Sequence, residues 1–259
     1  MAAVYAQPMV PYGHGPSAHH ASSSSHHHAS RRDRGYRVCD QCGRPETPTA
    51  SRFRLCGGCM TTQYCSQDCQ KNHWPAHKPI CQHTQGALKS QASAAPSPSE
   101  NIAKNLRKFT SAHEALLTWA GFQALQLKRM PSNVRHKALL IQLSSRPHAE
   151  SHRRLKMSSA RLVSRDYVND PLVQADIQRR DERCRREGGI GAAVVILEAE
   201  GVSQVMPVEV DSPADIAWDS RDDWQGVLYH FIDIGRTDFA QVLAAGMLGR
   251  GPGSVSALR

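Results

Sequence analysis

The chain has 259 residues and a formal net charge of +9, and 40% of its residues are hydrophobic. That composition allows a folded core, but no apolar run approaches the roughly eighteen residues of a membrane-spanning helix, and no basic segment followed by an apolar stretch indicates a signal peptide. Residues 128–165 are strongly basic and residues 209–239 are acidic. We expect these two blocks to face each other, so the basic composition alone is weak evidence for nucleic-acid binding.

Residues 1–37 contain mainly Ala, Ser, Pro, Gly and His, without a helical or strand period. This composition predicts a disordered, low-complexity leader. Its histidines are not held in any geometry that the sequence enforces. We therefore expect no specific metal site there.

Potential metal ligands are concentrated in the next 43 residues, which hold seven of the eight cysteines. Two CxxC pairs come first, followed by two pairs at i,i+4 spacing, which places each of those pairs on one face of a helical turn. An odd number of cysteines without a secretory signal argues against a disulfide cluster, and eight ligands suffice for two tetrahedral zinc sites. The eight are Cys39, Cys42, Cys56, Cys59, Cys65, Cys69, His77 and Cys81.

The residues among these ligands narrow the class of site. The pattern Tyr64-Cys65-Ser66-x2-Cys69-Gln70-x3-Trp74-x2-His77-x3-Cys81 resembles the MYND-type zinc finger, at about residues 39–81. The resemblance implies a small cross-brace finger, bounded here at 38–83, with interleaved ligation of two Zn(2+) ions per chain. Spacing alone leaves sequential sites open. The implied sets are Cys39, Cys42, Cys65 and Cys69 for one zinc, and Cys56, Cys59, His77 and Cys81 for the other.

The same resemblance implies protein–protein interaction, with the finger docking short proline-containing peptides, often in transcriptional regulation. Gln70 and Trp74 occupy the family's peptide-binding positions. An indole face and an amide suit an extended proline-rich strand, although Trp74 could instead only cap the small core of the finger. Reduced, zinc-bound thiols indicate the nucleus or the cytoplasm.

Local signals within the finger predict a short helix. Ser66 stands at the N-cap position and Pro75 is expected to end the helix. His73 is the only competitor of His77 for the ligand role, and we expect it to be exposed.

The rest of the chain is predicted to form a small mixed α+β domain at 101–248, after a Ser/Ala/Pro-rich linker at 84–100 and before a flexible tail at 249–259. The linker predicts that the finger and the domain fold independently. Periodicity places the elements in helix–strand–strand–helix–hairpin–helix order. These are a helix at 100–128, strands at 137–143 and 155–163, a charged helix at 170–187, a hairpin of 192–199 with 202–210, a helix around 224–232 and a short helix around 239–243.

Enzyme signatures are lacking in this domain, and we expect that the chain is not an enzyme. Some MYND fingers interrupt the fold of SET-type lysine methyltransferases, but the leader before this finger cannot supply half of that fold. Cys184 lies between two arginines on a charged helix, and we expect it to be a partly buried packing residue rather than a nucleophile. The alternative of nucleic-acid binding through residues 128–165 remains, although that stretch has few aromatic residues for stacking.

Overall fold

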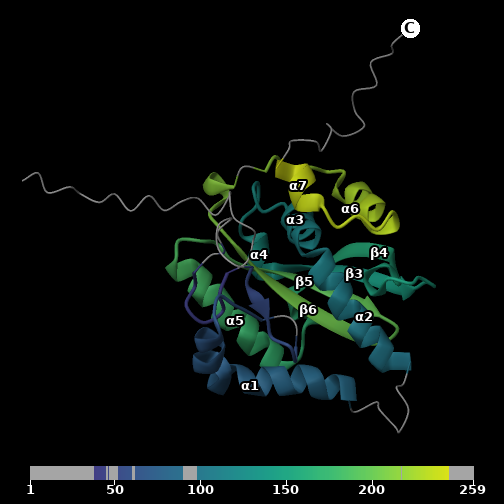
Figure 1. The fold of residues 1–259 in the computed structure, drawn as a ribbon. Helices are drawn as coiled ribbons and strands as arrows, with labels where there is room; N and C mark the ends of the chain where they lie inside the picture. The colour runs from purple at the N-terminus through teal and green to yellow at the C-terminus, as the bar shows by residue number, and fades with distance from the viewer. Residues whose placement is uncertain are drawn as a thin grey trace, which may run out of the picture.

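The computed structural model describes residues 38–44, 46, 52–59, 62–89, 98–216 and 218–244. The predicted leader at 1–37 and tail at 249–259 lie outside these residues. Within them, the chain forms a small cysteine-rich unit followed by a mixed helix–sheet domain, which confirms the predicted α+β class (Figure 1). None of the described helices is long and apolar enough to cross a membrane.

The cysteine-rich unit consists of a two-stranded ribbon and one long helix. Strand β1 (Arg54–Leu55) pairs antiparallel with β2 (Gln63–Tyr64), and helix α1 spans Gln67–Lys89. The helix begins as predicted, because the Ser66 hydroxyl accepts a hydrogen bond from the Cys69 backbone N–H at 3.1 Å. This cap satisfies one of the free donors in the first turn.

The prediction that Pro75 ends this helix is wrong. α1 continues through Pro75 and Pro79 to Lys89. Each proline removes a backbone hydrogen bond, at a cost of about 3 kcal/mol in a helix interior. Both prolines are exposed. The opposite face of the helix carries candidate metal ligands before, between and after the two prolines. Metal ligation along that face can offset the local cost of the missing hydrogen bonds.

The later domain is built on a four-stranded sheet with the order β4-β3-β5-β6. Its strands are β3 (Lys137–Ser145), β4 (Leu155–Ser164), β5 (Gly191–Ala199) and β6 (Val202–Val210), as predicted from alternation and length. The central pair β3 and β5 is parallel, and both outer pairs are antiparallel. Glu200 and Gly201 turn the β5–β6 hairpin with φ values of 49° and 80°, the left-handed pair that such two-residue turns need.

Both faces of this sheet are covered. Alternate residues of β5 belong to two separate cores, with Val195 and Leu197 in one and Val194 and Ile196 in the other. The first core also contains residues of α2 (Pro98–Ala112), α3 (Glu114–Ala124), α6 (Trp224–Asp233) and α7 (Phe239–Ala244), whereas α5 (Pro171–Arg186) contributes to the second. A short helix, α4 (Asn133–His136), precedes β3. Burial on both faces explains why β5 reads as a continuous apolar run.

One long helix was predicted at 100–128, and this is wrong. The chain instead forms α2 and α3, separated at His113, where φ is −104° and ψ is 16°. α3 is apolar and buried nearly all round, so its pattern carries no periodic signal that could mark the break. It ends at Ala124, before Gln126 takes a left-handed φ of 54°.

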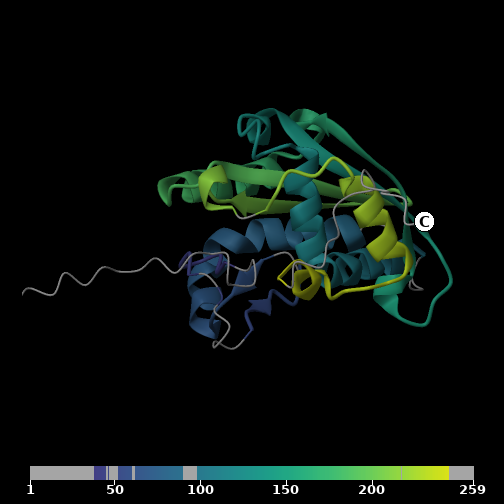
Figure 2. The same cartoon turned by 90° about the horizontal axis from the view of Figure 1, so that it is seen from above.

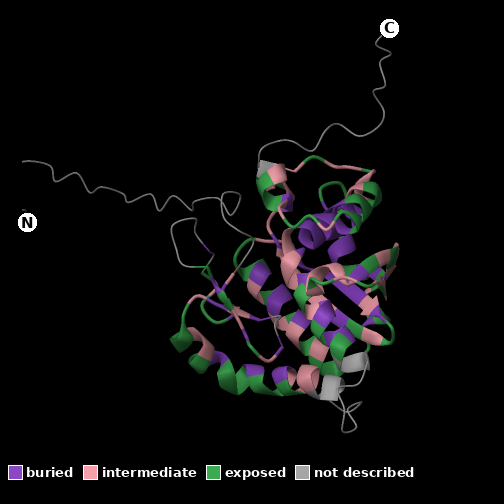
Figure 3. Ribbon diagram, turned by 45° about the vertical axis from the view of Figure 1, so that its right-hand side comes forward, coloured by how far each residue is buried: buried purple, intermediate pink, exposed green. Residues whose placement is uncertain are grey.

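The finger packs against the sheet domain rather than standing apart from it. α1 contacts both α2 and α5, and Figures 1 and 2 show the two units side by side. The described ends of the predicted linker are helical, with residues 84–89 in α1 and 98–100 in α2, and residues 90–97 lie outside the described part. The solvent-facing side of α1 remains largely exposed (Figure 3).

Candidate functional site

The eight predicted ligands gather into two clusters, in the interleaved arrangement. Within each cluster all ligand atoms lie within 4.8 Å of one another. The clusters are Cys39, Cys42, Cys65 and Cys69, and Cys56, Cys59, His77 and Cys81. Each cluster draws one pair from the CxxC turns. The second pair is Cys65, just before α1, with Cys69 in its first turn, or His77 with Cys81 in the body of α1. This interleaving ties the two halves of the finger together.

The first cluster has the dimensions of a tetrahedral zinc site. The Cys42 and Cys65 Sγ atoms are 3.6 Å apart, and those of Cys65 and Cys69 are 3.5 Å apart. Zn–S bonds of about 2.3 Å in a tetrahedron separate sulfur atoms by about 3.8 Å. The turn that presents Cys39 and Cys42 is closed by Gly43, whose N–H donates to the Cys39 carbonyl at 2.9 Å and whose φ of 70° suits glycine.

The second cluster is fully buried. The Cys56 and Cys81 Sγ atoms are 3.7 Å apart, and Cys59 Sγ lies 3.6 Å from His77 Nε2. Both separations match a tetrahedral site with three sulfur ligands and one nitrogen ligand. Two zinc ions thus fit the two donor sets, and each set fills four positions with protein atoms, as in structural zinc sites.

Groups outside the ligand set orient the second site. The Thr62 hydroxyl lies 3.4 Å from His77 Nδ1, and the Gln85 side-chain amide donates to Cys81 Sγ at 3.4 Å. A proton on Nδ1 shared with Thr62 leaves Nε2 free to bind metal. The amide donor helps to stabilise thiolate charge on Cys81.

The protein environment alone does not ionise these thiols uniformly. Burial, together with the neighbouring Cys69 and Cys39 thiols, raises the pKa of Cys65 to about 12. At Cys39 burial acts in the same direction, but backbone N–H groups of Cys42 and Cys65 outweigh it and lower the pKa to about 7. Since zinc binds thiolate, loading the site displaces protons and weakens as the pH falls.

His73 was expected to be exposed, and this is wrong. His73 is only 6% exposed, and its Nδ1 lies 3.0 Å from the Tyr64 hydroxyl. The imidazole stacks on His77 with ring centroids 5.6 Å apart. Burial, aided by the Arg179 charge, lowers the pKa of His73 to about 4. It is therefore a neutral packing residue beneath the second site and outside its donor set.

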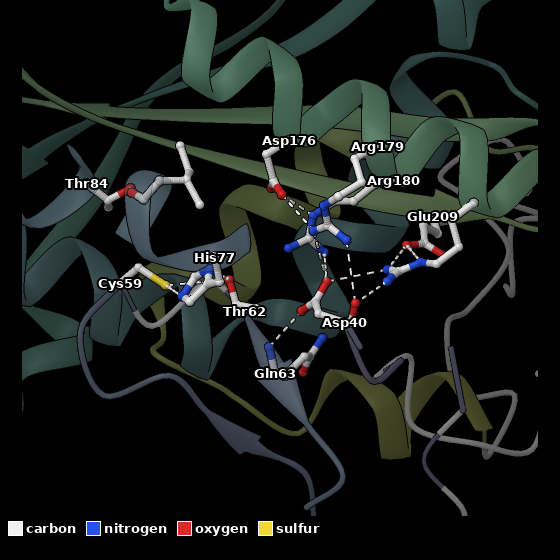
Figure 4. A network of polar contacts seen from close by, with 12 residues as sticks. Asp40, Cys59, Thr62, Gln63, His77, Thr84, Asp176, Arg179, Arg180 and Glu209 are labelled. Atoms are coloured by element: carbon white, nitrogen blue, oxygen red, sulfur yellow. Dashed lines mark hydrogen bonds and ion pairs between the residues drawn. The ribbon is translucent and has the colours of Figure 1, made fainter. Parts of the chain in front are cut away.

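Asp40 links the finger to the sheet domain. It lies in the turn between Cys39 and Cys42, and its side chain is completely buried. Asp40 Oδ1 is 2.7 Å from Arg180 Nη1 on α5, and Oδ2 accepts a hydrogen bond from the Gln63 backbone N–H at 2.8 Å (Figure 4). Arg183 Nη1 also donates to the Asp40 carbonyl at 2.7 Å. The turn that holds two candidate ligands is thus fixed to α5.

Further acids and arginines complete this network. Asp176 pairs with Arg179 at 2.7 Å and with Arg180 at 2.9 Å, and Arg183 Nε donates to Glu209 at 3.0 Å. Burial would raise the pKa of Asp176, but the Arg180 and Arg179 charges hold it below its usual range. Three carboxylates, counting Asp40, balance three guanidinium groups. The sequence predicts a charged helix at 170–187 but carries no local signal that pairs α5 with Asp40, so this network was not predicted.

The predicted peptide-contact residues lie on α1 one turn apart. Trp74 is 40% exposed, and its ring meets that of His77 edge-on, with centroids 6.0 Å apart. Gln70 is partly exposed, four residues earlier on the same helix. The two side chains therefore share one face of α1.

Other sequence candidates are engaged within the fold. Cys184 is completely buried and its Sγ lies 3.3 Å from the Val210 carbonyl, as expected of a packing residue. The expected contact between the basic and acidic blocks also occurs, with Arg129 3.2 Å from Asp222 and Arg146 3.5 Å from Asp233. Part of the basic stretch is therefore neutralised internally.

Comparison with known proteins agrees with this site. The profile of the MYND finger family matches residues 39–81. Human Egl nine homolog 1 is 37% identical over 59 residues, which cover 23% of this chain and 12% of that protein. The matched segment thus spans about an eighth of the relative's length, and no solved structure matches the chain. The chain contains a MYND zinc finger, which is a protein-interaction module.

Proposed function

We propose that the MYND finger of this chain docks proline-containing segments of other proteins through Gln70 and Trp74, and that the chain acts in transcriptional regulation in the nucleus or cytoplasm. The observation that carries the proposal is the exposure of Trp74. A large aromatic side chain that is 40% exposed on a small finger offers an apolar surface that is not used by the core.

The geometry of α1 supports a docking role for this face. His77 and Cys81 hold the helix from one side through the second metal site, so Trp74 and Gln70 stand on a rigid support. An extended proline-rich segment could pack its rings on the indole while the Gln70 amide hydrogen-bonds a peptide carbonyl. A contact of this size buries little area, so we expect an affinity on the order of micromolar.

We also propose that this chain is not an enzyme. Each zinc site takes all four ligands from the protein, which leaves no position for a reacting water. Methyl transfer from S-adenosylmethionine to a lysine peptide by the purified chain would contradict this proposal and favour the methyltransferase alternative.

Binding of an array of proline-containing ten-residue peptides tests the docking proposal. The zinc-loaded full chain should bind a subset of the array, and Trp74→Ala should abolish that binding while the zinc content stays the same. Tyr229→Ala is the matched control, because Tyr229 is an aromatic residue on α6 that is 52% exposed. Equal binding by the parent chain and Trp74→Ala would show that the indole belongs only to the finger's own packing.

Nucleic-acid binding through residues 128–165 has less support. Besides the two ion pairs with the acidic block, Lys128 donates to the Trp218 carbonyl at 2.8 Å and Arg154 Nε to the His148 carbonyl at 2.8 Å. Side chains held this way are poorly placed to contact phosphates.

A further inference from the structure

A cavity of about 410 Å³ lies where the finger meets the β6 edge of the sheet domain. α2 and α5 form its sides, and the second half of α1 lines it with Ile80, His83 and Thr84. The volume falls within the range of small-molecule sites in proteins. The cavity belongs to neither unit alone, because the finger and the domain both contribute walls.

Two side chains lining this cavity have buried polar atoms without hydrogen-bond partners in the described part of the chain. They are the Nε and Nη1 groups of Arg107 on α2, and both amide atoms of Gln204 on β6. Gln204 is only 7% exposed. Buried polar groups are nearly always paired, since leaving them unsatisfied is costly. Two such groups in one cavity therefore indicate that a ligand completes their hydrogen bonds.

The charge balance of the cavity indicates the sign of that ligand. His83 and Asp170 pair at 2.6 Å, and Arg180 pairs with Asp176 at 2.9 Å. Among the charged residues lining the cavity, only Arg107 lacks an acidic partner within the described residues. Burial lowers the pKa of Arg107, and the nearby charge of the Cys59 thiolate offsets this only in part. Arg107 is therefore the cationic side chain of this cavity that no described carboxylate pairs.

The cavity also has apolar walls. Leu106 on α2, Val173 on α5 and Ile196 on β5 are among the lining residues. A ligand that fits both kinds of wall carries one anionic group and an apolar body. An inorganic anion could neutralise Arg107 but has no apolar part to fill the rest of the cavity.

We propose that this cavity binds a small organic anion whose carboxylate or phosphate group pairs with Arg107 and the Gln204 amide, and whose apolar part packs against Leu106 and Ile196. Arg107 neutralises the anion and the Gln204 N–H donates to one of its oxygens. The site is distinct from the Trp74 face, and its occupancy is independent of the proposed peptide docking.

Titration of the zinc-loaded full chain with benzoate and phenyl phosphate tests this assignment, with benzamide as the neutral control. The readout is the NMR resonance of the Arg107 Nε–H, together with the backbone amide of Gln204. We expect saturable shifts with at least one anion, at a Kd on the order of millimolar for ligands of this size. The tighter of the two anions identifies the group that the cavity prefers.

Arg107→Met keeps an unbranched apolar chain in place of the aliphatic part of the arginine, removes the charge, and should weaken anion binding at least tenfold. If that variant does not fold, Gln204→Leu provides the second test and should also weaken binding. Absence of saturable binding by both anions would overturn the proposal. So would equal shifts with benzamide, or unchanged affinity in the folded variant.

Discussion

Asp40 Oδ1 lies 2.7 Å from Arg180 Nη1, and their side chains are 0% and 8% exposed. The two residues come from the finger and from α5, so a buried ion pair joins parts of the chain that the sequence presents as separate domains. Asp40 stands next to the ligand Cys39. The metal content of the finger and the packing of α5 are therefore expected to depend on each other.

Replacing Asp40 with alanine should destabilise the folded chain by about 3–5 kcal/mol. The substitution leaves the Arg180 charge buried with only part of its compensation, and breaking such a pair costs more than the intact pair contributes. Urea unfolding of the zinc-loaded protein measures the change. Asp68→Ala, which removes an exposed acid from the first turn of α1, is the control and should cost less than about 1 kcal/mol. A loss no larger than the control's would mean that the network contributes little.

Removing zinc should loosen α5 as well as the finger. Metal analysis should give two zinc ions per chain before chelation, and a ratio near one would contradict the two-site arrangement. After chelation, amide hydrogen exchange should become faster in α1 and around Arg179–Arg183, because the turn that holds Asp40 loses its metal support. Exchange in β3, inside the sheet, serves as the reference. Unchanged protection of α5 would restore the view that the linker separates two independent units.

Substituting Thr62 with valine should weaken zinc binding at the second site by about 10–100-fold, because the valine cannot hold the His77 ring through Nδ1. Competition with a chelator measures both affinities, and the first site provides the internal reference. Thr84→Val is the matched control, since the Thr84 hydroxyl donates to the Ile80 carbonyl within α1. An unaltered second-site affinity would show that the Thr62 contact is incidental.

His113 should make the fold less stable in mild acid. Burial, helped by His152 and Arg146, lowers the pKa of His113 from 6.5 to about 4. The unfolded chain therefore binds the proton more readily than the folded one between these values. Stability is complete above about pH 6.5 and falls as the pH drops toward 4, by about 1.4 kcal/mol per unit and on the order of 3 kcal/mol in total.

His113→Phe isolates this effect. The ring packs against Phe109 with centroids 4.6 Å apart, and its nitrogens have no hydrogen-bond partner among the described residues, so an apolar ring suits the site. Urea unfolding of parent and variant between pH 6.5 and 5.5 should show a shallower pH slope in the variant. The difference between the unfolding free energies of parent and variant at each pH cancels the titration of zinc ligands and other histidines, which the two proteins share. Parallel slopes would assign the acid sensitivity to other groups.

Much of the site and the positions of the strands along the chain could be predicted from local sequence. Ligand spacing identified the zinc-binding residues, and short apolar or alternating runs bounded by turn residues identified β3 to β6, because both signals lie within a few residues. The interleaving of ligands was implied only by family resemblance. His73 and Pro75 were misjudged because tertiary packing and metal ligation overrode local propensity.

Apart from the contact between the basic and acidic blocks, the long-range features could not be predicted. Arg179 and Arg183 contact Asp40 across 139 and 143 residues, and charges on a helix normally indicate a solvated face. The break at His113 was hidden because α3 is apolar on all sides. The cavity beside Arg107 depends on how α1, α2 and α5 meet, which no single segment determines.

Docking of proline-containing segments at Trp74 can be measured by NMR of the zinc-loaded chain with a peptide selected from the array. We expect saturable shifts of the Trp74 indole N–H and the Gln70 side-chain amide, with the indole signals of Trp119, Trp218 and Trp224 unchanged. Saturable binding that leaves the Trp74 and Gln70 resonances unmoved would contradict docking at Trp74.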